Sequence, residues 1–222
     1  GRVVRSMDKS VILVLATRNK GKTEEIRALL SGFPVTLKNL DDFGPIPEVV
    51  EDGDTFDDNA YKKASFTARV LGFPAIADDS GLVVEALNGE PGVYSARYAG
   101  EDADDAANNA KLLEQMAGVE DRRAAFQCVL SIAMPTGQAL TYEGRCDGVI
   151  AQAPSGEGGF GYDPLFYCPD KGKTFAELTM EEKGEISHRG RALKEVADEF
   201  DKVLIWIDMH TPMQERFECK GC

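Results

Sequence analysis

The segment PAIADDSG, residues 74–81, places two adjacent carboxylates directly after a short apolar run. We expect strands over Pro74–Ala77 and Leu82–Ala86, joined by a turn at Asp78–Gly81. Ligands often bind at strand ends in open α/β sheets, and two carboxylates held there suit a hard cation such as Mg²⁺. The alternative is that residues 79–81 form only a turn and bind nothing. The choice between these interpretations depends on the rest of the chain.

Strand patterns alternate with helix patterns on either side of this segment. The run Val11–Ala16 is typical of a strand buried on both faces, and Thr55 and Asp58 have N-cap and N3 spacing at the start of a helix. Further strands are predicted at Val35–Leu40, Ala124–Met134, Ala139–Ala153 and Leu165–Tyr167, and helices at Glu24–Leu30, Thr55–Leu71, Asp104–Met116 and Arg191–Lys202. The pattern indicates an α/β fold with a mixed central sheet and a long antiparallel hairpin, in two lobes that flank a cleft. One domain is expected over residues 11–208, with terminal extensions at 1–10 and 209–222.

Composition excludes several classes of partner. The net charge of -13 argues against non-specific binding to nucleic acid or anionic lipid, which requires a basic surface. No apolar run approaches the roughly 20 residues that a membrane-spanning helix needs. The five cysteines are an odd number, and the simplest interpretation is a reduced cytoplasmic protein. Cys219 and Cys222 form a C-x-x-C pair that could be redox-active or bind a metal, although no second pair has zinc spacing.

A basic loop, ATRNKGKT at residues 16–23, lies between the first predicted strand and the first helix. Free backbone N–H groups at a helix N-terminus favour phosphate, and the loop adds Arg18, Lys20 and Lys22. The loop nearly fits the P-loop pattern, but Ala16 stands where the first glycine belongs. A phosphate-binding loop of another kind is therefore favoured. The alternatives are a P-loop kinase or ATPase that uses Gly21-Lys22-Thr23, or a solvated basic loop.

Three other segments carry polar groups that suit a nucleotide. The acidic loop that begins at Glu51 could lend a carboxylate to a metal held by Asp78 or Asp79, or could simply be solvated. The glycine-rich segment Gly156–Asp163 allows close approach to a ligand and offers aromatic faces on which any base can stack. Near the last helix, Lys183, His188 and Arg189 are donors that could read a purine keto oxygen, while Ser187 is expected to cap the helix.

Taken together and in order, these segments resemble the inosine triphosphate pyrophosphatases. The resemblance rests on the motifs Leu15–Lys22, Ala77–Gly81, Gly92–Arg97, Gly159–Asp163 and Ser187–Arg189, and covers roughly residues 11–205. One departure is Arg18, where many members of that family carry glycine.

The resemblance implies a mixed α/β fold in two lobes, a homodimer, and Mg²⁺-dependent hydrolysis of deaminated purine nucleoside triphosphates (ITP, dITP, XTP) to the monophosphate and pyrophosphate. It implies that Asp79 is the proton acceptor and a metal ligand, with Glu51 as a second ligand. The residues implied in substrate binding are Thr17, Arg18, Asn19, Lys20, Gly21, Lys22, Ser80, Phe160, Gly161, Tyr162, Asp163, Lys183, His188 and Arg189. A non-catalytic nucleotide sensor on the same fold is the remaining alternative.

Overall fold

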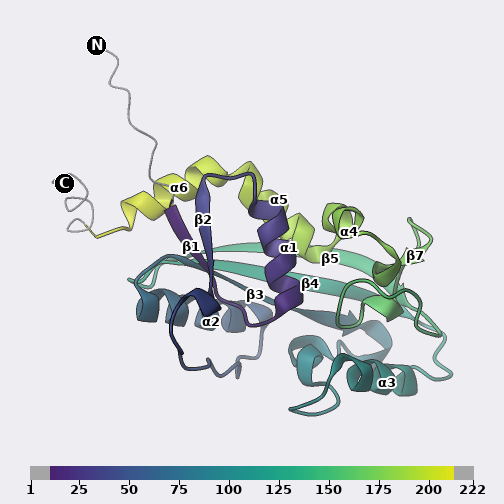
Figure 1. The fold of residues 1–222 in the computed structure, drawn as a ribbon. Coiled ribbons are helices and arrows are strands. Elements are labelled where there is room, and N and C mark those ends of the chain that lie inside the picture. The colour runs from purple at the N-terminus through teal and green to yellow at the C-terminus, as the bar shows by residue number, and fades with distance from the viewer. Residues whose placement is uncertain (1–10, 213–222) are drawn as a thin grey trace.

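The computed structural model describes residues 11–212, which form a seven-stranded mixed sheet with helices on both faces (Figure 1). The strand order is β2-β1-β3-β4-β5-β6-β7, with β1 parallel to β2 and β3 and the remaining pairs antiparallel. The strands are β1 (Val11–Leu15), β2 (Val35–Asn39), β3 (Ala75–Val84), β4 (Arg123–Ala133), β5 (Ala139–Ile150), β6 (Phe166–Cys168) and β7 (Lys173–Thr174). The helices are α1 (Lys20–Leu30), α2 (Phe56–Leu71), α3 (Asp105–Gln115), α4 (Met180–Ile186), α5 (His188–Asp198) and α6 (Phe200–Met209).

The predicted α/β class, the mixed sheet and the long hairpin are confirmed. Strands β4 and β5 pair from Arg123↔Val149 to Ala133↔Ala139. Helix α2 begins as expected, because the Thr55 side chain accepts a hydrogen bond from the backbone N–H of Asp58. In Figure 1 the helices α1, α4, α5 and α6 lie on one face of the sheet and α2 lies on the other, so the middle strands are covered on both sides.

The predicted turn at Asp78–Gly81 is wrong, because β3 runs unbroken through it. Ten consecutive residues of β3 pair with β4, from Ala75↔Ala133 to Val84↔Ala124, and this ladder satisfies the backbone through the polar stretch. Gly81 serves close packing instead of a turn. A Cβ at this position would lie 2.4 Å from the carbonyl oxygen of Gly92, in the 3₁₀ segment Gly92–Arg97. The two carboxylates therefore lie inside a strand and not at its end.

The predicted last helix is also wrong in its bounds. Helix α5 begins at His188, where the Ser187 side chain accepts a hydrogen bond from the backbone N–H of Gly190 at 2.9 Å, and the chain breaks again at Glu199 before α6. The preceding polar stretch is helical because Thr179 and Glu182 form a capping box that begins α4. Its Lys183 is buried in a charged site rather than exposed to solvent, which a pattern of polarity alone does not reveal.

The apolar core of the described residues falls into three clusters. One packs α1, α5 and α6 against β1, β3 and β4, and another packs α2 against the opposite face of the same strands. The third lies at the other end of the sheet, around Leu112, Phe126, Phe166 and Phe175. Within residues 11–212 no helix is long and apolar enough to cross a bilayer. The predicted extension 1–10, and Cys219 and Cys222 in the predicted extension 209–222, lie outside the described residues.

Candidate active site

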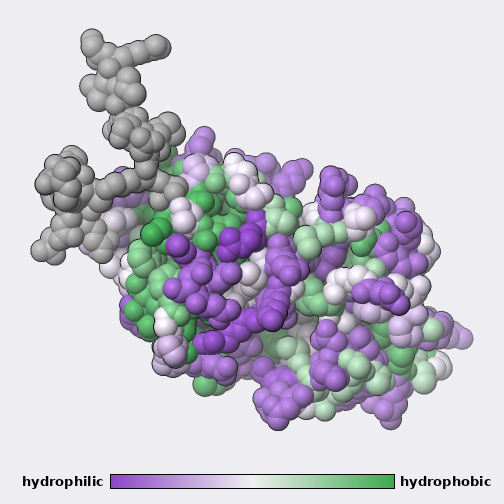
Figure 2. Space-filling model, viewed as in Figure 1, coloured by the Kyte–Doolittle hydropathy of each residue, from purple (hydrophilic) through white to green (hydrophobic). Residues whose placement is uncertain are grey.

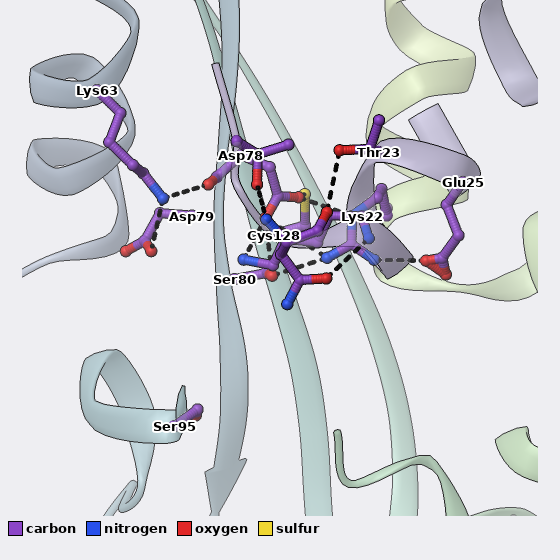
Figure 3. Close-up of polar contacts among 12 residues, drawn as sticks. Lys22, Thr23, Glu25, Lys63, Asp78, Asp79, Ser80, Ser95 and Cys128 are labelled. Carbon is purple, nitrogen blue, oxygen red and sulfur yellow. Dashed lines mark hydrogen bonds and ion pairs between the residues drawn. The ribbon is translucent and has the colours of Figure 1, made fainter. Parts of the chain in front are cut away.

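Strand β3 presents its two carboxylates to opposite faces of the sheet, as the two-residue period of a strand requires. Figure 3 shows Asp78 among residues near the start of α1, and Asp79 on the side of α2 with Lys63. Asp78 is fully buried and forms ion pairs with the Nζ of Lys22 at 2.9 Å and with the Nε of Arg189 at 2.8 Å. The hydroxyl of Ser80 and the thiol of Cys128 also donate hydrogen bonds to the Asp78 carboxylate, at 2.9 and 3.0 Å.

The surroundings of Asp78 keep it ionised. Burial alone would raise the pKa of this carboxyl, but the charges of Arg189 and Lys22 outweigh that effect and hold the pKa well below its usual range. Asp78 is therefore a fixed anion that orients Lys22 and Arg189.

Asp79 has a much poorer set of partners. Its Oδ1 lies 3.4 Å from the Nζ of Lys63, and its buried Oδ2 has no hydrogen-bond partner among the described residues. Burial raises the pKa of Asp79 to about 6, with further repulsion from Glu51 and Asp78, while Lys63 and Lys22 oppose the shift. A carboxyl with a raised pKa and a free oxygen in a cavity is what a proton acceptor or a metal ligand requires.

Lys63 connects the two carboxylates that the sequence proposes as metal ligands. Its Nζ lies 2.8 Å from Glu51 and 3.4 Å from Asp79, and it also donates to the carbonyl of Asp78 at 2.6 Å. Arg97 holds the same loop through the carbonyl of Glu51 at 3.0 Å. Sequence reasoning missed Lys63. The available signal was a lysine beside the alanine stripe of α2, one turn after the buried Asn59.

The basic loop leads directly into α1, which begins at Lys20 and not at the predicted Glu24. Asn19 caps the helix by accepting the backbone N–H of Lys22 at 3.1 Å, and the hydroxyl of Thr17 accepts the N–H of Asn19 at 3.2 Å. This start of the helix lets Lys22 form its ion pair with Asp78. Arg18 extends toward the loop before α2, where it bonds the carbonyl of Ile46. The positive end of the helix dipole and two cations thus face one cavity.

A smaller cavity of about 110 Å³ holds the residues predicted to contact a base. The Nζ of Lys183 bonds Asp163 at 2.6 Å and Glu25 at 2.8 Å, and lies 4.7 Å from the centre of the Phe160 ring. Glu25 also bonds Arg189 at 2.7 Å, so this carboxylate joins α1 to α4 and α5. Sequence reasoning missed Glu25 too, although it lies one helical turn after Lys22.

His188 is buried against an aromatic ring and is neutral. Its ring stacks on Phe126 with centroids 4.7 Å apart. Burial, followed by the charge of Arg189, holds the pKa of His188 well below its usual range. Its Nδ1 has no hydrogen-bond partner within residues 11–212, so the ring presents an unsatisfied polar atom beside the smaller cavity.

A larger cavity of about 800 Å³ adjoins the smaller one. It is lined by the basic loop, the loop before α2, Lys63 and Asp79. The two cavities share Asn19, Lys22, Ser80 and Ala96. Figure 2 shows hydrophilic side chains over the middle of this face, where Figure 1 places the start of α1 and the loop before α2. An elongated ligand can therefore lie with an anionic end in the larger cavity and a flat end in the smaller.

The structure brings most of the predicted site residues together. Thr17, Arg18, Asn19, Lys22, Ser80, Asp79 and Glu51 line the larger cavity, and Phe160, Gly161, Tyr162, Asp163, Lys183, His188 and Arg189 line the smaller. Lys20 is exposed and lines neither cavity. Gly21 lines neither as well, but a Cβ at this position would lie 2.3 Å from the Phe160 ring, so the phosphate-side loop and the base-side loop touch there.

The donor set fits a magnesium ion whose other ligands come from a substrate. No group of three or more acidic, histidine or cysteine side chains that could hold a metal occurs in the described part of the chain. Asp79 offers a buried oxygen without a partner among the described residues, and Glu51 is paired with the same Lys63 amine. Mg²⁺ is commonly bound through one or two carboxylates together with phosphates and water.

Comparison with known proteins gives one consistent answer. The profile of the Ham1 family matches residues 13–199. A dITP/XTP pyrophosphatase of Syntrophobacter fumaroxidans is 64% identical over 200 residues, covering 90% of this chain and 86% of that protein. The Ham1 protein of Staphylococcus aureus is 42% identical with a TM-score of 0.77, covering 86% of this chain and 98% of that one. A nucleoside-triphosphatase / dITP/XTP pyrophosphatase of Mycobacterium abscessus is 46% identical with a TM-score of 0.67, and the match covers 83% of this chain and 96% of that one. The chain belongs to the Ham1 family.

Proposed function

We propose that this protein hydrolyses deaminated purine nucleoside triphosphates (dITP, XTP and ITP) to the nucleoside monophosphate and pyrophosphate. The observation that carries the proposal is the pair of adjoining cavities, of which the larger is lined by Asp79 with its unpaired oxygen. A base in the smaller cavity directs its phosphates past Lys22 and Ser80 into the larger one. The names of the relatives, dITP/XTP pyrophosphatase, support the same activity.

Asp79 acts on the attacking water in this proposal. A carboxylate whose pKa is raised to about 6 is still ionised at neutral pH, yet is basic enough to accept a proton. Lys22 and Lys63 offset the charge that builds on the phosphate oxygens, since phosphoryl transfer depends mainly on positioning and electrostatic stabilisation. Ser80 contacts the substrate where the two cavities meet.

Magnesium would be held by Asp79 and Glu51 together with the phosphates. Bound there, it would supply charge neutralisation to the phosphates and make a bound water more acidic. Lys63 is within ion-pair distance of both carboxylates and keeps them near each other before the substrate arrives.

Selection of the base follows from hydrogen bonding in the smaller cavity. Hypoxanthine and xanthine carry a keto acceptor at position 6, where adenine carries an amino donor. Lys183 has three N–H donors, of which Asp163 and Glu25 take two, and Arg189 lines the same cavity while bonding Asp78. Such donors favour a keto group, and polar pairing of this kind can discriminate by about 10⁴-fold. The Phe160 ring would stack on the base whatever its identity.

A panel of ITP, dITP, XTP, GTP and ATP with Mg²⁺, scored for products, tests the function. We expect pyrophosphate and monophosphate from the deaminated nucleotides and little turnover of ATP. Orthophosphate with a diphosphate would support the alternative of a P-loop kinase or ATPase. Binding without turnover at any Mg²⁺ concentration would support a nucleotide sensor.

The proposal also includes a homodimer that acts in the cytoplasm. The three cysteines within the described residues, Cys128, Cys146 and Cys168, are buried free thiols, which suits a reducing compartment. Light scattering coupled to size-exclusion chromatography tests the dimer, because a single mass near that of one chain would refute it.

A further inference from the structure

Helix α3 forms part of the wall of the smaller cavity, although none of the sequence motifs lies in it. It is at the opposite end of the molecule from α6 (Figure 1), and its Asp105 and Asn108 line the cavity. The Asn108 side chain accepts the backbone N–H of Ala99 at 2.8 Å and donates to the carbonyl of Ala96 at 3.0 Å. The helix is therefore tied to the 3₁₀ segment that packs on β3.

Two side chains of α3 bind both polar groups of one glycine in the base-side loop, residues 160–163. The backbone N–H of Gly161 donates to the Oδ2 of Asp105 at 2.8 Å, and the carbonyl of Gly161 accepts from the Nδ2 of Asn109 at 3.0 Å. Asp105 and Asn109 are four residues apart in α3, so they lie on the same face of the helix. We call these two hydrogen bonds the Gly161 clasp. Gly161 has a φ of 61°, a conformation that is open to glycine without steric cost, so the clasp holds a residue with unusual backbone freedom.

Phe160, the residue before Gly161, offers the ring on which the base would stack. Its backbone N–H donates to Asp163 at 3.1 Å on one side, and on the other side its backbone is joined to the clasped glycine. The ring lies close to Gly21 at the start of α1, where a Cβ would be only 2.3 Å away. A small rotation of the Gly161 peptide would therefore press the ring against α1 or push it into the cavity. The tilt of the ring depends on how that peptide is held.

On the basis of the proposed function, we propose that Asp105 and Asn109 are positioning residues, which hold the Phe160 ring at the angle that stacks on the substrate base. Asp105 lines only the smaller cavity and Asn109 lines neither, so neither side chain is placed to act on the phosphates. An aromatic ring stacks on a base whatever its identity. The clasp therefore acts on the affinity for purine nucleotides as a class, and not on the chemical step.

The two positions require opposite hydrogen-bonding chemistry, and a general loss of structure would not reproduce this pattern. Position 105 must accept a hydrogen bond, so Asp105→Ala should raise KM for ITP about 10-fold with kcat nearly unchanged, as for the loss of part of a stacking contact. Asp105→Asn keeps an acceptor and should restore KM to within about twofold of wild type. Position 109 must donate, so Asn109→Asp should raise KM at least as much as Asn109→Ala does. Glu114→Ala is the matched control, because it removes a carboxylate from an exposed position on the same helix that lines neither cavity.

A double-mutant cycle tests whether Asp105 acts through Phe160. In a Phe160→Ala background there is no ring to position, so adding Asp105→Ala should raise KM by less than about twofold more. A full additional 10-fold increase, which is the additive result, would overturn the proposal, because Asp105 would then act on the substrate independently of the ring. An Asp105→Asn variant as impaired as Asp105→Ala would overturn it too.

Calorimetry without turnover keeps this proposal separate from the proposed function. Inosine monophosphate has a base but no pyrophosphate, and its Kd should be about 10-fold weaker in Asp105→Ala than in wild type. Mg²⁺-pyrophosphate has no base, and its Kd should stay the same. Any other pattern, such as equal weakening of both ligands, would overturn the role of the clasp. If wild type released no pyrophosphate from ITP but bound inosine monophosphate in a manner that depends on Asp105, the proposed function would fail while the clasp stood.

Discussion

The two faces of β3 carry neighbouring aspartates in opposite states. On the side of α1 and α5, Asp78 is surrounded by Lys22, Arg189, Ser80 and Cys128, and its pKa lies well below the usual range. On the side of α2, Asp79 has one distant lysine partner and a free buried oxygen, and burial raises its pKa to about 6. Burial is nearly the same for both, so the difference comes from the number and distance of the cations.

Two neighbouring residues of one strand therefore have different roles: Asp78 is structural, and Asp79 is placed to take part in the reaction. Asp78, which has several polar partners, fixes the cations that face the ligand cavities. Asp79 has an oxygen without a partner among the described residues, so it is left available to water, a metal or a proton. The predictions below change one side at a time.

The largest effect is expected from Asp79→Asn. Loss of a proton acceptor typically lowers the rate by about 10²–10⁴-fold, so kcat for ITP should fall about 1,000-fold while nucleotide binding remains. Single-turnover kinetics together with calorimetric titration of ITP without divalent ions would separate the two quantities. Near-normal turnover would rule out this role for Asp79.

The same variant has a signature in stability. Because the folded pKa of Asp79 is raised from 3.8 to about 6, wild type loses stability as the pH rises through that window, and none further above it. Asparagine does not ionise, so its stability advantage should grow between about pH 4 and pH 6 and then level off. The limit is about 3 kcal/mol from the size of the shift, reduced by the lost contact with Lys63. Urea unfolding without divalent ions across this range measures it.

A loss of stability, with the opposite pH trend, is expected from Asp78→Asn. Removing the anion leaves Lys22 without its carboxylate partner and the buried Arg189 with Glu25 alone, and breaking a buried ion pair typically costs about 3–5 kcal/mol. The stability that Asp78 contributes is full above pH 3.8 and is lost as the pH falls through its lower folded pKa. The deficit of the variant should therefore narrow in acid. A deficit that is constant with pH would show that the charge of Asp78 is not what stabilises the fold.

The smallest effect is expected from Cys128, whose thiol lies 3.0 Å from Asp78. Cys128→Ala removes this hydrogen bond and should lower the free energy of unfolding by about 1 kcal/mol, with kcat unchanged. Cys128→Ser keeps a donor and should lose less. If alanine were as stable as wild type, the thiol would contribute nothing to the shell around Asp78.

Local patterns in the sequence were enough to predict the class of fold but not the path of β3. The hairpin and α2 follow from apolar alternation and from the Thr55 cap, which are encoded within a few residues. The residues Asp78 to Gly81 have turn chemistry, and only their pairing with distant β4 keeps them in a strand. Similarly, the motifs predicted Lys22 and Asp79 but not Lys63 and Glu25. Lys63 contacts Asp79, 16 residues away, and Glu25 contacts Arg189, 164 residues away, and no local spacing encodes such contacts.

The contact between Gly21 and Phe160 limits how this site can be changed. Any side chain at position 21 would collide with the ring, since even a methyl group would lie 2.3 Å away. The loop that faces the phosphates and the loop that faces the base are therefore in contact. A redesign of the base-side loop for a new nucleotide must also take account of the phosphate-side loop.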